Sequence, residues 1–363
     1  MTMQQSDVAI IGAGIFGLSA AWALQKDGHR VAVYEAGRIG SGASGGLVGA
    51  LSPFMPEKWT TKKEFQLKAL LEAEAFWDEV ALVSGLPSGY HRLGRLLPLR
   101  TQKHQNQAQV RAQEVPLLWK GQASWDVIDA LEGFAPSEFG FVHETLSARL
   151  NPRQAITALS EAIRNKGGEI FEDHPVEDLD DLSEGLKILA AGHNCRAFTP
   201  DWPVEFWSAV KGQSALLDVS LPRNTPMIFE SGTYVVPHGS GGVAVGSTSE
   251  YDWIDPKACD EKLDVVLQKA ADLYPTLKGA RVKERWAGLR PRARLPDPVV
   301  GKMPDRDAWI LAGGFKIGLA MGPVMGEILA SLIAGQEPDY PESYRLEHHL
   351  ERCRLEPRDP LTD

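Results

Sequence analysis

Glycines at three places along the 363-residue chain are the first residues whose spacing suggests chemistry. The first stretch, Gly12 to Gly17 (Gly-Ala-Gly-Ile-Phe-Gly), follows an apolar run at residues 7–11 and precedes a helical run at residues 18–24. In a strand-turn-helix setting, Gly12 makes the tight turn, Gly14 lets the backbone approach a pyrophosphate, and Gly17 lets the helix pack closely on the strand. A negative diphosphate would lie on the free N–H groups at the positive helix end. The spacing therefore predicts a dinucleotide site.

An acidic residue follows the next apolar run, as this kind of site requires. Residues 30–34 are predicted to form a second strand, and Glu35 stands at its end. A carboxylate there can accept hydrogen bonds from an adenosine ribose. This favours a cofactor with a free ribose 2′-OH over one with a 2′-phosphate.

The composition limits the classes of protein. A chain with 43% hydrophobic residues can bury a large core, and its length predicts two domains. A net charge of −10 and a pI near 5.5 argue against a nucleic-acid-binding surface. Cys195, Cys259 and Cys353 have no paired or metal-binding spacing, so we expect no disulfide, no metal site and a reducing cytoplasm. No run resembles a signal peptide or is long enough to span a membrane.

The first half of the chain alternates strands and helices. Apolar residues recur at helical spacing over residues 64–83, and Asn151-Pro152 is the expected start of another helix, with Asn as N-cap. Strands are predicted at residues 169–172 and 187–191. Residues 95–99 and 115–118 are interpreted as strands or loops. This βαβ order favours a doubly wound sheet.

The pattern of predicted strands and helices changes near residue 208. Strands with alternating character are predicted at residues 214–219, 227–236 and 243–247, with one helix at residues 260–273. A buried strand at 309–312 and a helix at 318–333 then follow, and the tail after Gln336 is expected to be peripheral.

The fold class expected from this order is a Rossmann-like, doubly wound α/β domain that binds a dinucleotide, plus an α+β substrate domain with a mostly antiparallel sheet. The expected division assigns residues 1–205 and 295–363 to the cofactor domain. Residues 206–294 would form the substrate domain.

Four further motifs carry a family resemblance. They are the Gly-rich loop at residues 42–51, Trp-Ala-Gly-Leu-Arg-Pro at 286–291, Asp-Pro-Val-Val-Gly at 297–301 and Gly-Gly-Phe-Lys-Ile-Gly at 313–318. In this order, together with the first glycine turn, the chain resembles the D-amino acid oxidase superfamily, in particular its glycine oxidase, sarcosine oxidase and D-amino acid dehydrogenase branches. The resemblance implies bound FAD and oxidation of an amine next to a carboxylate. The loop lacks a Cys or His where some relatives bond flavin covalently, so non-covalent FAD is expected.

The resemblance also implies which residues hold the cofactor. The diphosphate is expected to bind at Gly12, Gly14, Ile15, Phe16 and Gly17, and the adenosine end with its ribose at Glu35, Arg38 and Val176. The loop that lines the diphosphate and the isoalloxazine contributes Ala43, Ser44, Gly46 and Gly49. The segments that pass close to the flavin contain Gly192, Gly314, Phe315, Lys316, Ile317 and Gly318.

Three residues match substrate-binding positions of the family. Arg290 matches the arginine that holds the substrate carboxylate, and its planar guanidinium can do so with two parallel hydrogen bonds. Tyr234 matches a tyrosine that shares this carboxylate, and Lys316 matches a position that reaches it in sarcosine oxidase. With the substrate so held, hydride would pass from carbon to flavin N5, and O2 or another acceptor would reoxidise the flavin. The roles of Arg292 and Arg294 stay open.

The same residues also have interpretations without a catalytic or binding role. Arg290 could be a surface ion-pair partner, Tyr234 a packing residue and Lys316 a solvated one, and His91, His143 and His238 are expected to be structural or exposed. Alternative functions are an oxidase of a glycine-like group on modified tRNA uridine, an NAD-dependent dehydrogenase that shares only the first motif, and a non-enzymatic FAD-binding protein. A homo-oligomer is compatible with the sequence.

Overall fold

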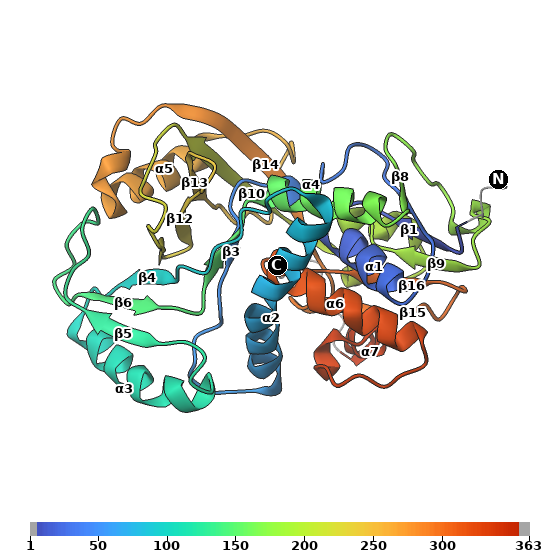
Figure 1. The fold of residues 1–363 in the computed structure, drawn as a ribbon, viewed down its shortest axis with the longest axis horizontal. Helices are drawn as coiled ribbons and strands as arrows, with labels where there is room; N and C mark the ends of the chain where they lie inside the picture. The colour runs from blue at the N-terminus through green and yellow to red at the C-terminus, as the bar shows by residue number, and fades with distance from the viewer. Residues whose placement is uncertain (1–5, 356–363) are drawn as a thin grey trace.

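The computed structural model describes residues 6–355, and most of their strands belong to two sheets (Figure 1). The first contains β1 (Val8–Ile11), β2 (Val31–Tyr34), β8 (Glu169–Phe171), β9 (Leu186–Leu189), β15 (Val299–Lys302) and β16 (Trp309–Ala312). The second contains β4 (Arg95–Pro98), β5 (Trp125–Ile128), β6 (Phe141–Glu144), β10 (Ser208–Leu217), β11 (Met227–Glu230), β12 (Thr233–Pro237), β13 (Val243–Gly246) and β14 (Val282–Arg292). A short pair joins β3 (Ala50–Leu51) to β7 (Ala148–Arg149).

The first sheet is the expected dinucleotide fold. Its strand order is β15-β16-β9-β1-β2-β8, and every neighbouring pair is parallel except β15-β16. The central strands are buried on both faces, which explains why they are continuous apolar runs and not alternating ones. The carboxyl ends of β1, β2 and β9 therefore meet at one edge, where this fold binds ligands.

Seven helices complete the described part of the chain: α1 (Ile15–Lys26), α2 (Thr61–Ser84), α3 (Gln102–Leu118), α4 (Pro152–Asn165), α5 (Glu261–Leu273), α6 (Gly318–Ile333) and α7 (Leu346–Leu355). The expected N-cap of α4 is confirmed, because Asn151 Oδ1 accepts a hydrogen bond from the Gln154 N–H at 3.2 Å. Helices α1 and α6 lie side by side beside the parallel sheet, and α2 lies between the two sheets in Figure 1. Within residues 6–355, no helix has the length and apolar character needed to cross a membrane.

The second sheet is mostly antiparallel, as expected, but it draws on more of the chain than residues 206–294. Its order is β14-β10-β13-β12-β11-β4-β6-β5, and β11-β4 is its one parallel pair among the described strands. Strands β4, β5 and β6 lie within residues 1–205, the segment expected to belong to the cofactor domain. They join this sheet through the pairing of β4 with β11, a long-range contact that local sequence patterns do not encode.

Three local expectations need correction. The single strand expected at residues 227–236 is a hairpin, with positive φ at Ser231 (48°) and Gly232 (86°) in its turn. Residues 115–118 are the end of helix α3 and not a strand or loop. The tail after Gln336 is not peripheral as far as it is described, because Tyr344 and Leu346 are buried in the core.

Candidate functional site

The Gly12–Gly17 turn has the expected shape for a diphosphate. Gly12 lies at φ 107°, and α1 begins directly after Gly14 with no capping side chain. A Cβ at Gly17 would lie 1.9 Å from the Gly12 carbonyl oxygen, so only glycine permits this close approach of helix and turn. The helix thus presents a backbone N–H cradle at the carboxyl edge of the sheet, and this cradle fits the diphosphate of FAD.

Glu35 lies beside the same turn. Its carboxylate accepts hydrogen bonds from the backbone N–H groups of Ala13 at 2.8 Å and Gly37 at 3.0 Å. A carboxylate has further lone pairs, so these bonds leave acceptor capacity for ribose hydroxyls. Arg38 is exposed and pairs with Asp173 at 3.1 Å, and Val176 packs against the core cluster that contains Ile11 and Leu189. The ribose and adenine roles of these residues stay predictions.

The Gly-rich loop connects the glycine turn with the second sheet. Ser44 Oγ accepts a hydrogen bond from the Ile15 N–H at 2.9 Å, at the start of α1. Further along, Gly46 lies against the Trp286 ring of β14, and Gly49 O accepts from Leu150 N at 2.8 Å. The loop therefore lies between the two sheets, where the flavin ring is expected.

The closing motif reaches both sheets as well. Gly314 lies against the Phe16 ring of the first motif, and the Phe315 N–H donates to the Pro291 carbonyl of β14 at 2.9 Å. Ile317 is the N-cap of α6 and Gly318 its first residue. This contact brings Lys316 close to the end of β14, which carries Arg290.

Arg290 is a partly buried cation at this junction. Its Nη2 donates to Ser247 Oγ at 2.8 Å and to the Thr248 carbonyl at 3.1 Å, and Nη1 approaches the Lys211 carbonyl at 3.4 Å. No described carboxylate forms an ion pair with it. Partial burial lowers the pKa of Arg290, and the more distant negative charge of Glu250 opposes this shift. An incoming anion would therefore stabilise this group.

Two features make room for Arg290 and place a second cation beside it. A Cβ at Gly212 of β10 would lie 2.0 Å from Arg290 Nη2, so the guanidinium lies over the backbone of this glycine. Lys316 is an exposed residue, but partial burial of its ammonium and the positive charge of Arg290 lower the pKa of that group. Glu250 is the acidic group that acts on Arg290 from a distance, and it already pairs with Lys262 at 3.0 Å. Two like charges without a directly paired carboxylate are typical of an anion-binding site.

Tyr234 lies on the same second sheet, in a row that crosses four strands. Sheet register aligns Tyr234 with Gly246, Gly246 with Ser214, and Ser214 with Trp286. The tyrosine hydroxyl accepts a hydrogen bond from Arg95 Nη1 at 3.2 Å. Because that bond occupies the oxygen as acceptor, the hydroxyl proton remains available to donate to a substrate carboxylate.

Sequence reasoning missed three of these neighbours. Gly212 and Ser247 shape and bind the Arg290 side chain, and no local pattern distinguishes them. Arg95 had a signal, since it is a charged residue in the apolar run Arg-Leu-Leu-Pro and is only 4% exposed. A buried charge of this kind requires a partner, here Glu144 at 3.0 Å.

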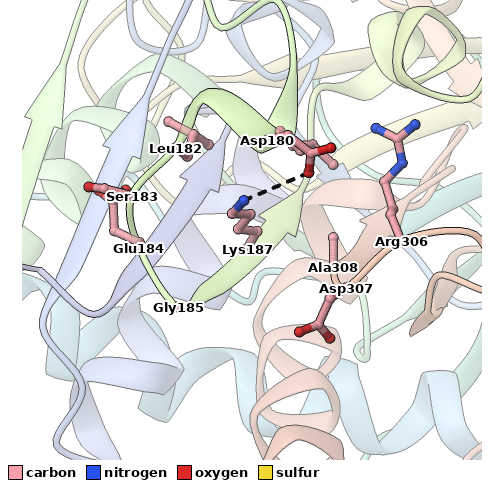
Figure 2. A pocket seen from close by; sticks show the side chains of 10 residues that line it. Asp180, Leu182, Ser183, Glu184, Gly185, Lys187, Arg306, Asp307 and Ala308 are labelled. Carbon is pink, nitrogen blue, oxygen red and sulfur yellow. Dashed lines mark hydrogen bonds and ion pairs between the residues drawn. The ribbon is translucent and has the colours of Figure 1, made fainter.

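A separate polar pocket lies away from all of these residues. It has a volume of about 260 Å³ and includes Asp180, Lys187 and Arg306, with an Asp180–Lys187 ion pair at 3.9 Å (Figure 2). It lies at the amino ends of β9 and β16, whereas the glycine turn is at the carboxyl ends. The parallel-sheet rule therefore assigns it no part in cofactor binding.

Comparison with known proteins agrees with this geometry. A family model described as "FAD dependent oxidoreductase" matches residues 7–332. Over 96% of this chain and 99% of the relative, the sequence is 26% identical to a glycine oxidase of Geobacillus kaustophilus (strain HTA426). The crystal structure of glycine oxidase from Geobacillus kaustophilus superposes with a TM-score of 0.82 at 22% identity, covering 95% of this chain and 99% of that one. L-proline dehydrogenase from P. horikoshii gives 0.81 at 19% identity, covering 98% and 100%.

The fold and the site thus define a two-sheet flavoenzyme. The chain belongs to the FAD dependent oxidoreductase family, which confirms the expected D-amino acid oxidase superfamily, its fold class and FAD as cofactor. The NAD-dependent dehydrogenase alternative is thereby wrong.

Proposed function

We propose that the protein oxidises a small amino acid at the carbon next to its carboxylate, the substrate being glycine, a D-amino acid or an N-substituted glycine. The observation that carries this proposal is the partly buried Arg290, which forms no ion pair with a carboxylate among the described residues and has Lys316 beside it. The full-length similarity to glycine oxidases supports the same substrate class.

Each residue has a proposed task. Arg290 binds the substrate carboxylate through parallel charge-assisted hydrogen bonds, and Tyr234 donates its hydroxyl proton to the same group. Lys316 adds positive charge at the carboxylate or at the flavin edge, together with the N-terminus of α6. Gly12, Gly14, Gly17 and Ser44 hold the diphosphate end, and Glu35 the ribose.

Orientation is the main contribution of the protein to the chemistry. FAD, when bound, supplies the acceptor for the hydride that leaves the substrate carbon. With the carboxylate fixed, the neutral amine supplies its lone pair to form the imine as the carbon–hydrogen bond breaks, and water then hydrolyses the imine. No side-chain acid or base is required for the hydride step. O2 or another acceptor regenerates the oxidised cofactor, and the wide spacing of the three cysteines along the sequence favours a reducing cytoplasm as the location of the protein.

The test is anaerobic bleaching of the flavin by the amino acid and by its decarboxylated amine, in wild type and in Arg290→Ala. Loss of a charge-assisted pair in a partly desolvated site is expected to weaken substrate binding by about 2–5 kcal/mol. Arg290→Lys should recover only part of it, because an ammonium cannot form the two-pronged contact. Flavin content should stay near that of wild type.

A matched control lies on the same strand. Arg285 of β14 is partly exposed and already pairs with Asp264 at 2.5 Å, so Arg285→Ala should bleach as wild type does. If wild type reacts equally with the amino acid and the amine, Arg290 is not a carboxylate anchor. A flavin that no amine or amino acid bleaches would favour a non-enzymatic FAD-binding protein.

A further inference from the structure

A second group of basic side chains lies at the end of β12, away from Arg290. We call His91, Arg149, Arg223 and His238 the Arg149 cluster. Arg149 is 2% exposed and ends β7. Its Nη2 donates a hydrogen bond to the Arg223 carbonyl at 2.8 Å, and its Nε is buried without a hydrogen-bond partner. No described carboxylate pairs with it. A buried guanidinium without a counter-charge is costly for a protein that does nothing with it.

The neighbouring histidines share this environment. His238 Nε2 contacts the Leu47 carbonyl at 2.9 Å, and its buried Nδ1 has no partner. His91 pairs with Arg149 through the backbone in both directions, at 2.9 Å each, while its side chain reaches solvent. Burial and then the charges of Arg149 and Arg223 lower the pKa of His91, so the local field is positive.

Gly239 marks where an anion would fit. A Cβ built on this glycine would lie 3.4 Å from His91 Nε2 and 3.6 Å from Arg149 Nη2, and no protein atom lies closer. Both nitrogens therefore border a space large enough for at least one heavy atom. Arg223, Ser240 and His91 are exposed, which leaves this space open to solvent.

We propose that the Arg149 cluster binds a phosphate group. Arg149 forms the buried base, His91 and Arg223 stand at the opening, and a dianion matches this accumulation of positive charge better than a monoanion does. The site is distinct from the substrate anchor, because His238 is four residues beyond Tyr234 along an extended segment, roughly 13 Å away. It is also distinct from the diphosphate cradle at the start of α1.

The sharpest variant is Gly239→Ala. Its methyl group meets only ordinary contact distances and no positive φ, so the fold should be unaffected while the proposed phosphate position is filled. Arg149→Met is the complementary variant, which removes the charge and keeps an apolar stem. Arg92→Met is the matched control, since Arg92 is next to His91 and donates to the carbonyls of Thr145 and Gln122.

The experiment titrates FAD-saturated protein with inorganic phosphate by calorimetry, at an ionic strength held constant with chloride. Wild type and Arg92→Met should bind phosphate at one site, and Gly239→Ala and Arg149→Met should bind it at least about tenfold more weakly. In wild type, histidine NMR should show that phosphate raises the pKa of His91, because a dianion beside it favours the imidazolium. Glycerol phosphate, tested in parallel, distinguishes a site for the free ion from one for a phosphorylated metabolite.

Three results would overturn the proposal. They are wild-type protein that takes up no phosphate beyond the ionic-strength effect, equal binding by Gly239→Ala and wild type, and acetate that binds as tightly as phosphate. Each of these is independent of amino acid oxidation, so the proposed function can stand or fall separately.

Discussion

At the residue scale, the two cations of the candidate site act on each other. Burial and the charge of Arg290 lower the pKa of Lys316, so its ammonium loses its proton at a lower pH than a free lysine does. Affinity for a carboxylate ligand should therefore fall as pH rises through the lowered pKa of Lys316. This alkaline fall should be absent in Lys316→Met and should move to higher pH in Arg290→Ala, where the like charge is gone.

The measurement is binding of a simple carboxylate without an amine, followed through the flavin spectrum as a function of pH. Such a ligand avoids titration of a substrate amine. An alkaline limb that persists unchanged in Lys316→Met would return Lys316 to a solvated role.

Arg95 is a second residue for which the effect of a substitution on stability depends on its partner in the core. Arg95 and Glu144 are both buried, and Glu144 also accepts hydrogen bonds from the Leu146 and Ser147 backbone N–H groups at 2.9 Å. Arg95→Met leaves the carboxylate unpaired in the core, which should lower the free energy of unfolding by about 3–5 kcal/mol. Thermal unfolding measures this loss.

A double variant isolates the charge term. Adding Glu144→Gln removes the unpaired charge and retains an oxygen for the two N–H groups, so Arg95→Met/Glu144→Gln should be more stable than Arg95→Met alone. Equal stability of the two would mean that lost packing, not the buried charge, explains the effect.

At the element scale, the junction of β1 and α1 depends on one close approach. Gly17→Ala places a methyl group on the Gly12 carbonyl oxygen, so the turn must open and α1 must move away from β1. We expect purified Gly17→Ala to contain little or no FAD, measured as the ratio of flavin to protein absorbance.

Ala21→Gly in the same buried helix is the control for this prediction. It costs roughly 1 kcal/mol of helix propensity but leaves the turn intact, so it should keep its FAD. Normal FAD content in Gly17→Ala would show that the helix start does not hold the diphosphate.

At the scale of the whole molecule, FAD would link the two sheets. The Gly-rich loop and the closing motif each contact the parallel-sheet side and β14, so a cofactor between them stabilises only the folded arrangement. Removing FAD should therefore lower the unfolding midpoint, and free FAD at 100 times its dissociation constant should restore about 2.7 kcal/mol.

Release of FAD by denaturation tests whether the cofactor is bound non-covalently. Acid precipitation should leave the yellow colour in the supernatant, since the loop offers no Cys or His for a bond to the flavin. A yellow pellet would contradict this expectation.

The sequence alone determined the features that local chain geometry requires. Gly12, Gly14 and Gly17 predicted the turn because a tight strand-to-helix junction needs residues without a Cβ at these positions. Asn151-Pro152 predicted the start of α4 by a similar local rule. The order of such motifs along the chain predicted the family and its cofactor, and the match of the family model to residues 7–332 confirms this prediction of a flavin enzyme.

Only the tertiary structure decided what long-range pairing controls. The placement of β4, β5 and β6 in the second sheet, the position of Arg290 over Gly212, and the bond from Arg95 to Tyr234 each join segments far apart in sequence. The Arg149 cluster is of this kind too, since its members come from separate loops and strands that carry no shared pattern. These side chains contact residues that are far away in the sequence. The type of a residue, such as a charged residue in an apolar run, indicates that it needs a partner but does not identify that partner.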